Sequence, residues 1–426
     1  MARLPTPPSP RGALARLLQL GYTTARLFGQ NGLQFHAAAA TFFFLLSATP
    51  LLLLLSYALQ WLGQFAENSV AATILMAALY EQLHVDTLTA YGLIPRRAQL
   101  AASGVGLLTL VLSSRGLVNA LQGAFKVIFP NHHKRNLMVS WALPFIILPV
   151  LFLMAGAGAL VQVTLVFLAQ NDFIGIGNAH VLQAINSLFG FAILWALLFS
   201  AYWRLPRQHP PARDAALFAL LATTSLVLLF ALFGAFFKLE NYQNLYGALG
   251  SVVFVLMAGY FAFLLLYAWA QALYAYGKAD ITALEKLFLA GSGEGASKLE
   301  SYVFSDTGRL LDKYGETHPH GHVLIREGNT DRTAYFLYAG RAAAIKHSDT
   351  GARRLGELTE GQLFGEMAYL LDEPRTASVV AEGELTVLAL PPTVLEELMQ
   401  HSAPLSRRII DTLCQRLERM NLTNVR

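Results

Sequence analysis

The sequence has a single cysteine and few charged residues. Cys414 stands alone, so no disulfide can form within the chain and no cysteine-based metal site can be assembled. Lys, Arg, Asp and Glu make up 14% of the 426 residues, whereas soluble globular proteins contain about a quarter. The sequence also lacks a nucleophile–base motif, a metal-ligand spacing and a Walker loop. We therefore expect neither an enzyme nor a metal protein.

The few charged residues are distributed unevenly along the chain. Residues 1–280 contain 15 Lys or Arg and 7 Asp or Glu, whereas residues 281–426 contain 16 and 20. Only the second segment has the charge content of a soluble domain. The basic residues of the first segment flank apolar runs and form no stripe on a polar domain, which argues against a nucleic-acid partner.

Long apolar runs predict about six transmembrane helices, because a helix needs about 20 mostly apolar residues to cross a bilayer. The candidate spans are residues 35–62, 98–114, 137–168, 181–203, 214–237 and 246–276. Lys and Arg gather before the first span, between the second and third, and between the fourth and fifth, with Arg96 and Arg97 as the exception. The positive-inside rule then places both termini in the cytoplasm.

Three segments resemble, in the same order, signature segments of the YihY/BrkB family. They are HAAAATFFFLLSATPLLLLL (36–55), GLVNALQGAFKVIF (116–129) and LYGALGSVVFVLMAGYFAFLLLYAWAQALYAYG (245–277). The resemblance covers about residues 15–280 and implies a bacterial inner-membrane protein with six spans. It also implies a role in transport or in the cell envelope, beside an older label as a ribonuclease of the BN type. The segment Arg115–Phe129 has helical apolar spacing, which fits either a helix at the inner membrane surface or a helix packed in the core.

A stretch rich in Gly and Ser follows the last span. AGSGEGASK (290–298) contains three Gly, two Ser and no bulky side chain, which predicts a flexible linker. We therefore divide the chain into four parts: a cytoplasmic N-terminal segment (1–30), a six-span membrane domain (31–280), a linker (281–300) and a soluble domain (301–426).

The soluble domain is predicted to be an α+β domain built on a β-roll. Short alternating runs bounded by Gly, Asn or Asp indicate strands: HVLIREG, TAYFLYAGRAAAIK, LGELTEG, TASVVAE and ELTVLAL. The segment SYVFSDTGRLLDKYG before them is helix-like, and PPTVLEELMQ begins a helix with proline. The last segment, 405–422, predicts an amphipathic helix with Leu405, Ile409, Leu413 and Leu417 on one face. Cys414 lies in that helix, and we expect its thiol to be buried.

This order of elements resembles a cyclic nucleotide-binding domain over about residues 301–424, and FGEMAYLLDEPRTAS (364–378) resembles the phosphate-binding cassette of that family. The resemblance implies a nucleotide site made by Phe364, Gly365, Glu366, Met367, Arg375, Thr376 and Ala377. Physical chemistry agrees with these roles. Gly365 lets the ligand approach the backbone, and Arg375 supplies a forked cation for the cyclic phosphate. Glu366 suits the ribose 2′-hydroxyl, and the short helix after it directs N–H groups to the phosphate.

The expected ligand is a cyclic purine nucleotide, with cAMP favoured over cGMP. The Thr376 hydroxyl is compatible with either nucleotide. The final helix offers Leu413, Leu417 and Met420 as apolar cover for the base, and Glu418 is its one candidate carboxylate for guanine. Three alternating histidines, His318, His320 and His322, would point the same way only if their backbone were extended, and we expect no metal site.

Three classes of function remain for such a chain. A transporter or envelope protein regulated by a cyclic nucleotide fits every feature above. A cyclic nucleotide-gated channel would carry a repeating Arg in its fourth span and a filter sequence, and neither is present. A membrane-bound enzyme would need an acid–base or metal constellation. Expected partners are the bilayer and the nucleotide, a homo-oligomer is left open, and nucleic acid is excluded.

Overall fold

The computed structural model describes residues 10–46, 104–130, 179–206, 209–237, 242, 249–290, 303–304, 307–348 and 351–424. The chain forms two compact units. One unit is Thr23–Ala275, and the other combines Met1–Tyr22 with Tyr276–Arg426. The boundary between the units at 275–276 lies close to the end of the last predicted span.

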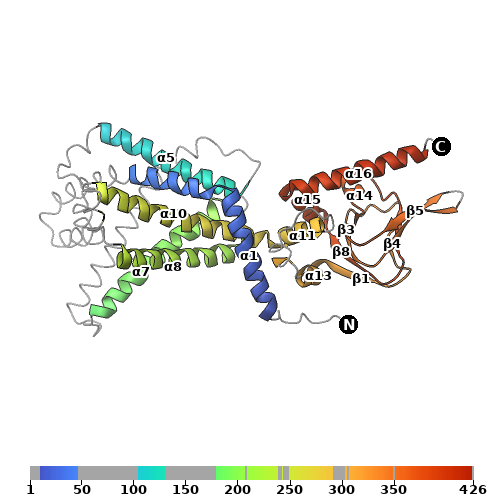
Figure 1. Ribbon diagram of the computed structural model, residues 1–426, viewed down its shortest axis with the longest axis horizontal. Helices are drawn as coiled ribbons and strands as arrows, with labels where there is room; N and C mark the ends of the chain where they lie inside the picture. The colour runs from blue at the N-terminus through green and yellow to red at the C-terminus, as the bar shows by residue number, and fades with distance from the viewer. Residues whose placement is uncertain are drawn as a thin grey trace. The chain divides into compact units, whose positions relative to one another are not determined.

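The first unit is helical (Figure 1). Its described helices are the later part of α1 (Pro10–Gln30), the apolar helix Leu33–Leu46, α5 (Gly104–Ile128), α7 (Ala179–Arg204), α8 (Ala212–Phe236) and α10 (Gly250–Gly277). Within the described residues, three stretches are long and apolar enough to cross a membrane: Ser187–Arg204, Ala212–Phe236 and Val252–Gly277. They correspond to the last three predicted spans. The predicted span 137–168 lies outside the described residues, and 35–62 and 98–114 are described only in part.

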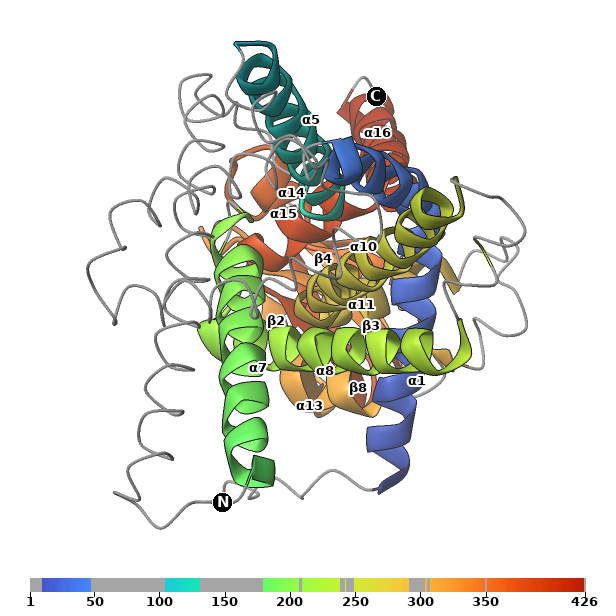
Figure 2. The same ribbon diagram turned by 90° about the vertical axis from the view of Figure 1, so that its left-hand side faces the viewer.

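Small residues let the helices of this unit approach closely. A Cβ atom added at Gly116 of α5 would lie 2.2 Å from the Phe43 ring, and one added at Gly259 of α10 would lie 3.0 Å from Thr41 Cγ2. The helix Leu33–Leu46 therefore packs against both α5 and α10 at glycines. Helices α7 and α8 also pack against each other (Figure 2).

The structure decides between the two readings of Arg115–Phe129. This segment continues helix α5 and is not a separate surface helix. Val118, Phe125 and Ile128 are buried, and the Phe125 ring lies 6.3 Å from that of Tyr202 and 6.4 Å from that of Tyr267. The segment therefore packs in the core of the helical unit.

The second unit contains two antiparallel four-stranded sheets, as the β-roll prediction required. The first sheet has the order β1 (Gly315–His318), β8 (Leu385–Leu390), β3 (Ala334–Ala339) and β6 (Leu363–Phe364). The second has the order β2 (Val323–Ile325), β7 (Ser378–Ala381), β4 (Ala342–Ser348) and β5 (Gly351–Leu358). Residues 315–318, which the sequence placed at the end of a helical segment and before the first run, form β1 instead.

The central strands β3 and β8 of the first sheet are covered on both faces, which explains their nearly continuous apolar sequences. Leu337 of β3 and Val387 of β8 face the core between the two sheets. Phe336 of β3 and Leu388 of β8 face a second core formed with helices. Those helices are α11 (Ala279–Ala290), α13 (Gly308–Tyr314), α15 (Pro392–His401) and α16 (Ala403–Asn424).

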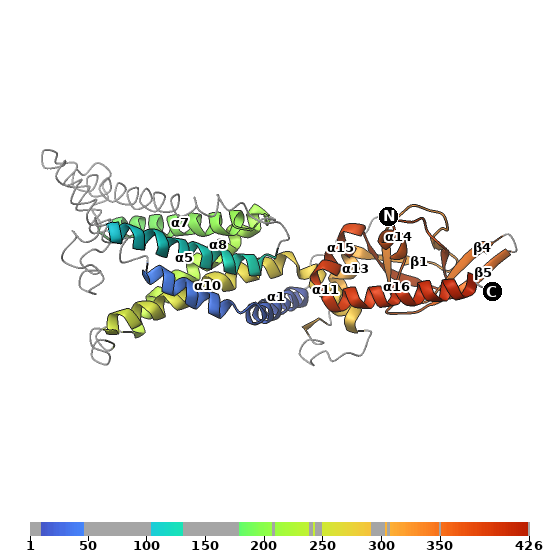
Figure 3. The ribbon, with the colours of Figure 1, turned by 90° about the horizontal axis from the view of Figure 1, so that it is seen from above.

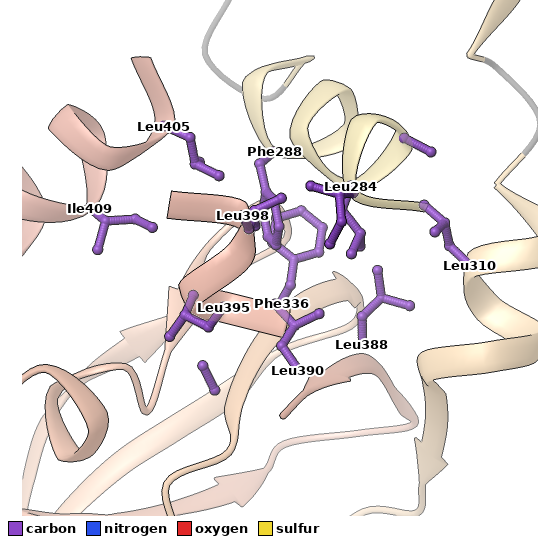
Figure 4. Packing of buried hydrophobic residues seen from close by; sticks show 13 residues of the cluster. Leu284, Phe288, Leu310, Phe336, Leu388, Leu390, Leu395, Leu398, Leu405 and Ile409 are labelled. Atoms are coloured by element: carbon purple, nitrogen blue, oxygen red, sulfur yellow. The ribbon is translucent and has the colours of Figure 1, made fainter. Parts of the chain in front are cut away.

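Helix α11 corrects the first part of the predicted linker. Residues 281–290, assigned to a flexible segment, form most of this helix. Leu284 and Phe288 are 0% and 4% exposed, and the Phe288 ring meets that of Phe336 edge-on at 4.4 Å between centroids (Figure 4). Full burial of such a side chain stabilises a fold by about 1.5–3 kcal/mol. The remainder of the predicted linker, 291–300, lies outside the described residues.

The C-terminal helices follow the predicted pattern in their first turns. Helix α15 starts with proline at its N-terminus, and α16 runs as one long helix beside the roll (Figure 3). Leu405 and Ile409 are buried on the predicted face of α16. Cys414, however, is exposed, so the prediction of a buried thiol was wrong.

Candidate functional site

The seven predicted nucleotide-binding residues lie on one continuous segment that links the two sheets. Phe364 ends β6 of the first sheet, the four-residue helix α14 (Met367–Leu370) follows, and β7 of the second sheet starts at Ser378. The Phe364 ring is buried in the core between the sheets and stacks on Tyr335 at 5.6 Å. The segment is therefore anchored at both ends in the roll.

Gly365 occupies a backbone conformation that favours glycine, with a φ angle of +77°. A Cβ atom at this position would lie 2.7 Å from Arg375 Nη1 and 3.0 Å from Ile325 Cδ1. The absence of a side chain therefore serves two purposes here, since it permits the turn and leaves room for the arginine.

Arg375 is the centre of the site. It is 5% exposed, and its guanidinium donates from Nη1 to the Gly365 carbonyl at 2.5 Å and from Nη2 to the Thr333 carbonyl at 2.6 Å. Nη2 also donates to Asp331 Oδ2 at 3.0 Å. Hydrogen bonds from a charged donor are stronger than hydrogen bonds between neutral groups. These three bonds therefore hold the guanidinium in one orientation.

Asp331 was not predicted, yet it supplies the counter-charge of Arg375. Its other carboxylate oxygen accepts a hydrogen bond from Thr333 Oγ1 at 3.0 Å. Partial burial raises the pKa of Asp331, but the hydrogen bonds from Thr333 and Arg375 outweigh burial and hold the pKa below its usual value. Because Asp331 lies 44 residues before Arg375 in the sequence, no local motif could have identified it.

The loop that carries Asp331 is joined to the loop of Arg375 by further contacts. Gly328 N donates to the Arg375 carbonyl at 2.8 Å, and Arg375 N donates to the Asn329 carbonyl at 2.9 Å. Arg332 pairs with Asp372, whose φ angle is +57°. Each loop thus supplies the cation of one ion pair and the anion of the other. The two ion pairs hold the segment 364–378 against the loop that precedes β3.

The other predicted residues of the segment differ in how deeply they are buried. Glu366 is 1% exposed and precedes α14, where its carbonyl accepts from Leu370 N at 3.0 Å. Met367, Thr376 and Ala377 are half-buried. Residues 366–376 therefore carry a buried carboxylate, a buried guanidinium and a half-buried hydroxyl. Of the predicted lid residues, Leu413 is half-buried, and the side chains of 417–420 lie outside those the structure describes.

The histidines before β2 form a separate cluster. The His318 and His322 rings stack at 4.4 Å between centroids, and His318 Nε2 lies 3.2 Å from Glu316 Oε2. Among the described residues no group of three His, Cys, Asp or Glu side chains could hold a metal ion. The two rings are nearly parallel, with 6° between their planes, so their nitrogen atoms do not converge on a common point.

The helical unit buries polar side chains on one face of α10. Tyr267 and Gln271, one helical turn apart, are 0% exposed. Asn31 Nδ2 donates to Gln271 Oε1 at 2.9 Å. Tyr267 Oη and Gln271 Nε2 find no hydrogen-bond partner among the described residues.

Comparisons with known proteins match both parts of the chain. The family model for virulence factor BrkB matches residues 24–283, and the model for the cyclic nucleotide-binding domain matches residues 316–402. These two matches lie in the order that the sequence resemblances predicted.

Two curated relatives each match about a quarter of this chain. The cAMP-dependent protein kinase regulatory subunit of Pyricularia oryzae is 37% identical over 112 residues, which are 26% of this chain and 28% of the relative. That of Neurospora crassa is 33% identical over 93 residues, 22% of this chain and 24% of the relative. The chain thus spans about a quarter of the length of these relatives. Among solved structures, the Thermus thermophilus catabolite activator protein is 24% identical, with 30% of this chain and 59% of that chain covered and a TM-score of 0.26.

Proposed function

Because the chain belongs to the virulence factor BrkB family and carries a cyclic nucleotide-binding domain, we propose that a cyclic nucleotide regulates the membrane domain. The observation that carries the proposal is the buried Arg375, whose guanidinium is held by the Gly365 carbonyl in the same segment as the buried Glu366. We propose cAMP as the ligand, and the curated relatives support this choice because they are cAMP-dependent regulatory subunits.

The ligand would replace an interaction that Arg375 already makes. An anionic cyclic phosphate competes with Asp331 for the Nη2 donor, since both offer anionic acceptor oxygens to the same forked cation. Glu366 would accept the ribose 2′-hydroxyl, because an ionised carboxylate is an acceptor only. Binding then releases Asp331 from the guanidinium and changes the contact between the two loops.

A change in the roll has a covalent route toward the last membrane helix. Helix α10 ends at Gly277 and α11 begins at Ala279, with Lys278 between them. Lys278 pairs with Glu397 of α15. Helix α11 itself accepts a hydrogen bond from Ser402 Oγ at Glu285 Oε1 (2.9 Å) and from Arg408 Nη1 at the Phe288 carbonyl (2.6 Å). We propose that movement of α15 and α16 on ligand binding is passed through α11 to α10.

The regulated activity that we propose is transport or an envelope-related role at a bacterial inner membrane, and not catalysis. Both termini would lie in the cytoplasm, where cyclic nucleotides are present. The distribution of Lys and Arg in the loops supports this orientation.

Calorimetry on the full chain in detergent tests the ligand. We expect cAMP to bind the wild-type protein and to bind Arg375→Ala more weakly by about 2–5 kcal/mol, because the phosphate loses its buried counter-charge. Arg375→Lys should also bind more weakly, because the forked geometry is lost. Arg353→Ala, on the exposed strand β5, is the matched control and should bind normally.

Two outcomes contradict the proposal. Equal affinity of wild type and Arg375→Ala, or no binding by either, would show that the site is not used. If cGMP displaces cAMP at tenfold lower concentration, a difference of about 1.4 kcal/mol, cGMP is the ligand instead. Regulation is tested separately by hydrogen exchange of α10, which should change on addition of cAMP in the wild type and stay unchanged in Arg375→Ala.

A further inference from the structure

Helix α1 has two different faces. On one face, Gln19 Nε2 donates to the Val303 carbonyl at 3.0 Å, and the Tyr22 ring lies edge-on to Phe304 at 6.2 Å. Thr23 on the same face is 8% exposed. This face therefore packs against the short segment that precedes helix α13 of the second unit.

The opposite face of α1 is apolar and exposed. Leu14, Leu17 and Leu18 are 62%, 66% and 48% exposed, and Gly21 and Ala25 continue the exposed stripe. Offsets of three, four, seven and eleven residues place all five on one side of a helix. Adjacent leucines with this exposure mark a surface that contacts another apolar phase.

The charge of α1 indicates what covers the leucines. Helix α1 contains Arg11, Arg16 and Arg26, and the sequence has no Asp or Glu before Glu67. Three arginines without an acidic residue would repel a second copy of α1 and would attract a negatively charged surface. A leucine stripe combined with basic residues is the pattern of a helix that lies in the interface of an anionic bilayer.

The position of α1 in the chain supports the same occupant. The helix ends at Gln30, Gly32 breaks it with a φ angle of +60°, and the apolar helix Leu33–Leu46 begins directly afterwards. If the apolar helix enters the bilayer, the amphipathic helix directly before it lies at the membrane–water interface, at the level of the lipid headgroups.

We propose that α1 docks on the surface of an anionic membrane, with Leu14, Leu17 and Leu18 inserted among the lipids. Its other face contacts Val303 and Phe304, so the segment that precedes α13 is tethered to the lipid surface through α1. This contact is additional to the transmembrane helices and does not depend on the nucleotide.

Site-specific fluorescence on the full chain in proteoliposomes tests the proposal. Cys414→Ser removes the one native thiol, and Leu14→Cys or Arg16→Cys then introduces a label position. Both residues are exposed, and they lie about 200° apart round the helix. A nitrobenzoxadiazole label at position 14 should show blue-shifted emission and quenching by phospholipids with brominated acyl chains. The label at position 16 should show a smaller shift and weaker quenching.

The lipid headgroup is varied in the same experiment. Quenching at position 14 should be stronger in vesicles that contain phosphatidylglycerol than in phosphatidylcholine alone, and Arg11→Gln with Arg16→Gln should abolish this difference. Equal behaviour of the two labels would overturn the proposal. A blue shift at position 14 without quenching would also overturn it, because the leucines would then be covered by protein. A phosphatidylglycerol preference that survives the double substitution would refute the role of the arginines. Circular dichroism and size-exclusion profiles identify any variant that fails to fold.

Discussion

Arg375 in the roll and the pair Tyr267 and Gln271 in the helical unit are buried polar groups with different hydrogen bonding. In the roll, the buried Arg375 makes hydrogen bonds to two carbonyls and to Asp331. In the helical unit, the equally buried Tyr267 Oη and Gln271 Nε2 have no partner among the described residues. A buried polar group without a partner costs about 1–3 kcal/mol. Tyr267 Oη and Gln271 Nε2 carry this cost, whereas the guanidinium of Arg375 does not.

This difference shows where chemistry can be assigned to residues. The roll holds the Arg375 guanidinium with loops that come from distant parts of the chain, and Asp331 accepts a hydrogen bond from one of its donors. The helical unit places Tyr267 and Gln271 on one face of α10 within a single turn, where Asn31 donates to Gln271 Oε1. The first arrangement holds a charged side chain in one orientation, and the second leaves two polar atoms without a partner among the described residues.

The largest expected effect concerns the boundary between the units. A fragment of residues 276–426 should be far more stable than a fragment of residues 299–426, because the second lacks α11. Ile281, Leu284 and Phe288 are each at most 5% exposed, and each contributes about 1.5–3 kcal/mol when fully buried. Urea unfolding followed by circular dichroism measures the difference. Equal stability of the two fragments would mean that α11 is dispensable, as a flexible linker would be.

A substitution at Gly365 should have the next largest effect. Gly365→Ala combines a left-handed backbone with a Cβ atom 2.7 Å from Arg375 Nη1, and we expect a loss of about 1–3 kcal/mol in the free energy of unfolding. Nucleotide affinity should fall as well, because the guanidinium must move. Calorimetry with cAMP and urea unfolding measure both effects.

Gly361→Ala is the matched control for this substitution. Gly361 has a φ angle of +83°, but nothing lies within 4 Å of the position that its Cβ atom would occupy. It should therefore lose stability through backbone strain alone and keep its affinity for the nucleotide. Equal affinities of the two variants would argue against the close contact between Gly365 and Arg375.

The sequence could predict the parts of the site that lie within one short segment. Phe364, Gly365, Glu366 and Arg375 form a pattern that can be recognised without knowledge of the fold, and the structure places Gly365 in contact with Arg375. Asp331 could not be predicted, because an aspartate between Thr330 and Arg332 resembles any other loop residue until the fold places it beside Arg375. The information about this contact lies in the tertiary structure.

The same distinction applies to the fold. Hydropathy was sufficient for α7, α8 and α10, because a bilayer imposes a minimum apolar length on each helix. The role of α11 was missed because its neighbour, the Gly- and Ser-rich stretch, dominated the composition of the predicted linker. Its four-residue apolar spacing, Leu284 to Phe288, was the available signal, and only the packing against Phe336 shows which domain uses it.

Two tyrosines sharpen the comparison inside the helical unit. Tyr202 Oη donates to the Leu266 carbonyl at 2.7 Å, so Tyr202→Phe should lower stability by about 0.6 kcal/mol, as is typical of hydrogen bonds between membrane helices. Tyr267→Phe removes a hydroxyl that has no partner among the described residues and should leave stability unchanged or raise it. Thermal unfolding in detergent compares the two variants. A clear loss in Tyr267→Phe would show that this hydroxyl is bound by something else.

The smallest expected effect is the pH dependence of the Arg375–Asp331 pair. The pKa of Asp331 is lower in the folded domain than its usual value of about 3.9. Its charged form therefore stabilises the fold fully above the unfolded pKa, and this stabilisation is lost as pH falls through the folded pKa. The side chain of Asp331 is 49% exposed, so solvent screening limits the contribution to less than about 1 kcal/mol. Asp331→Asn should be less stable than wild type at neutral pH, and the difference should disappear in acid. Urea unfolding at a series of pH values in low salt measures this difference, and a gap that widens in acid would contradict the assigned direction of the pKa shift.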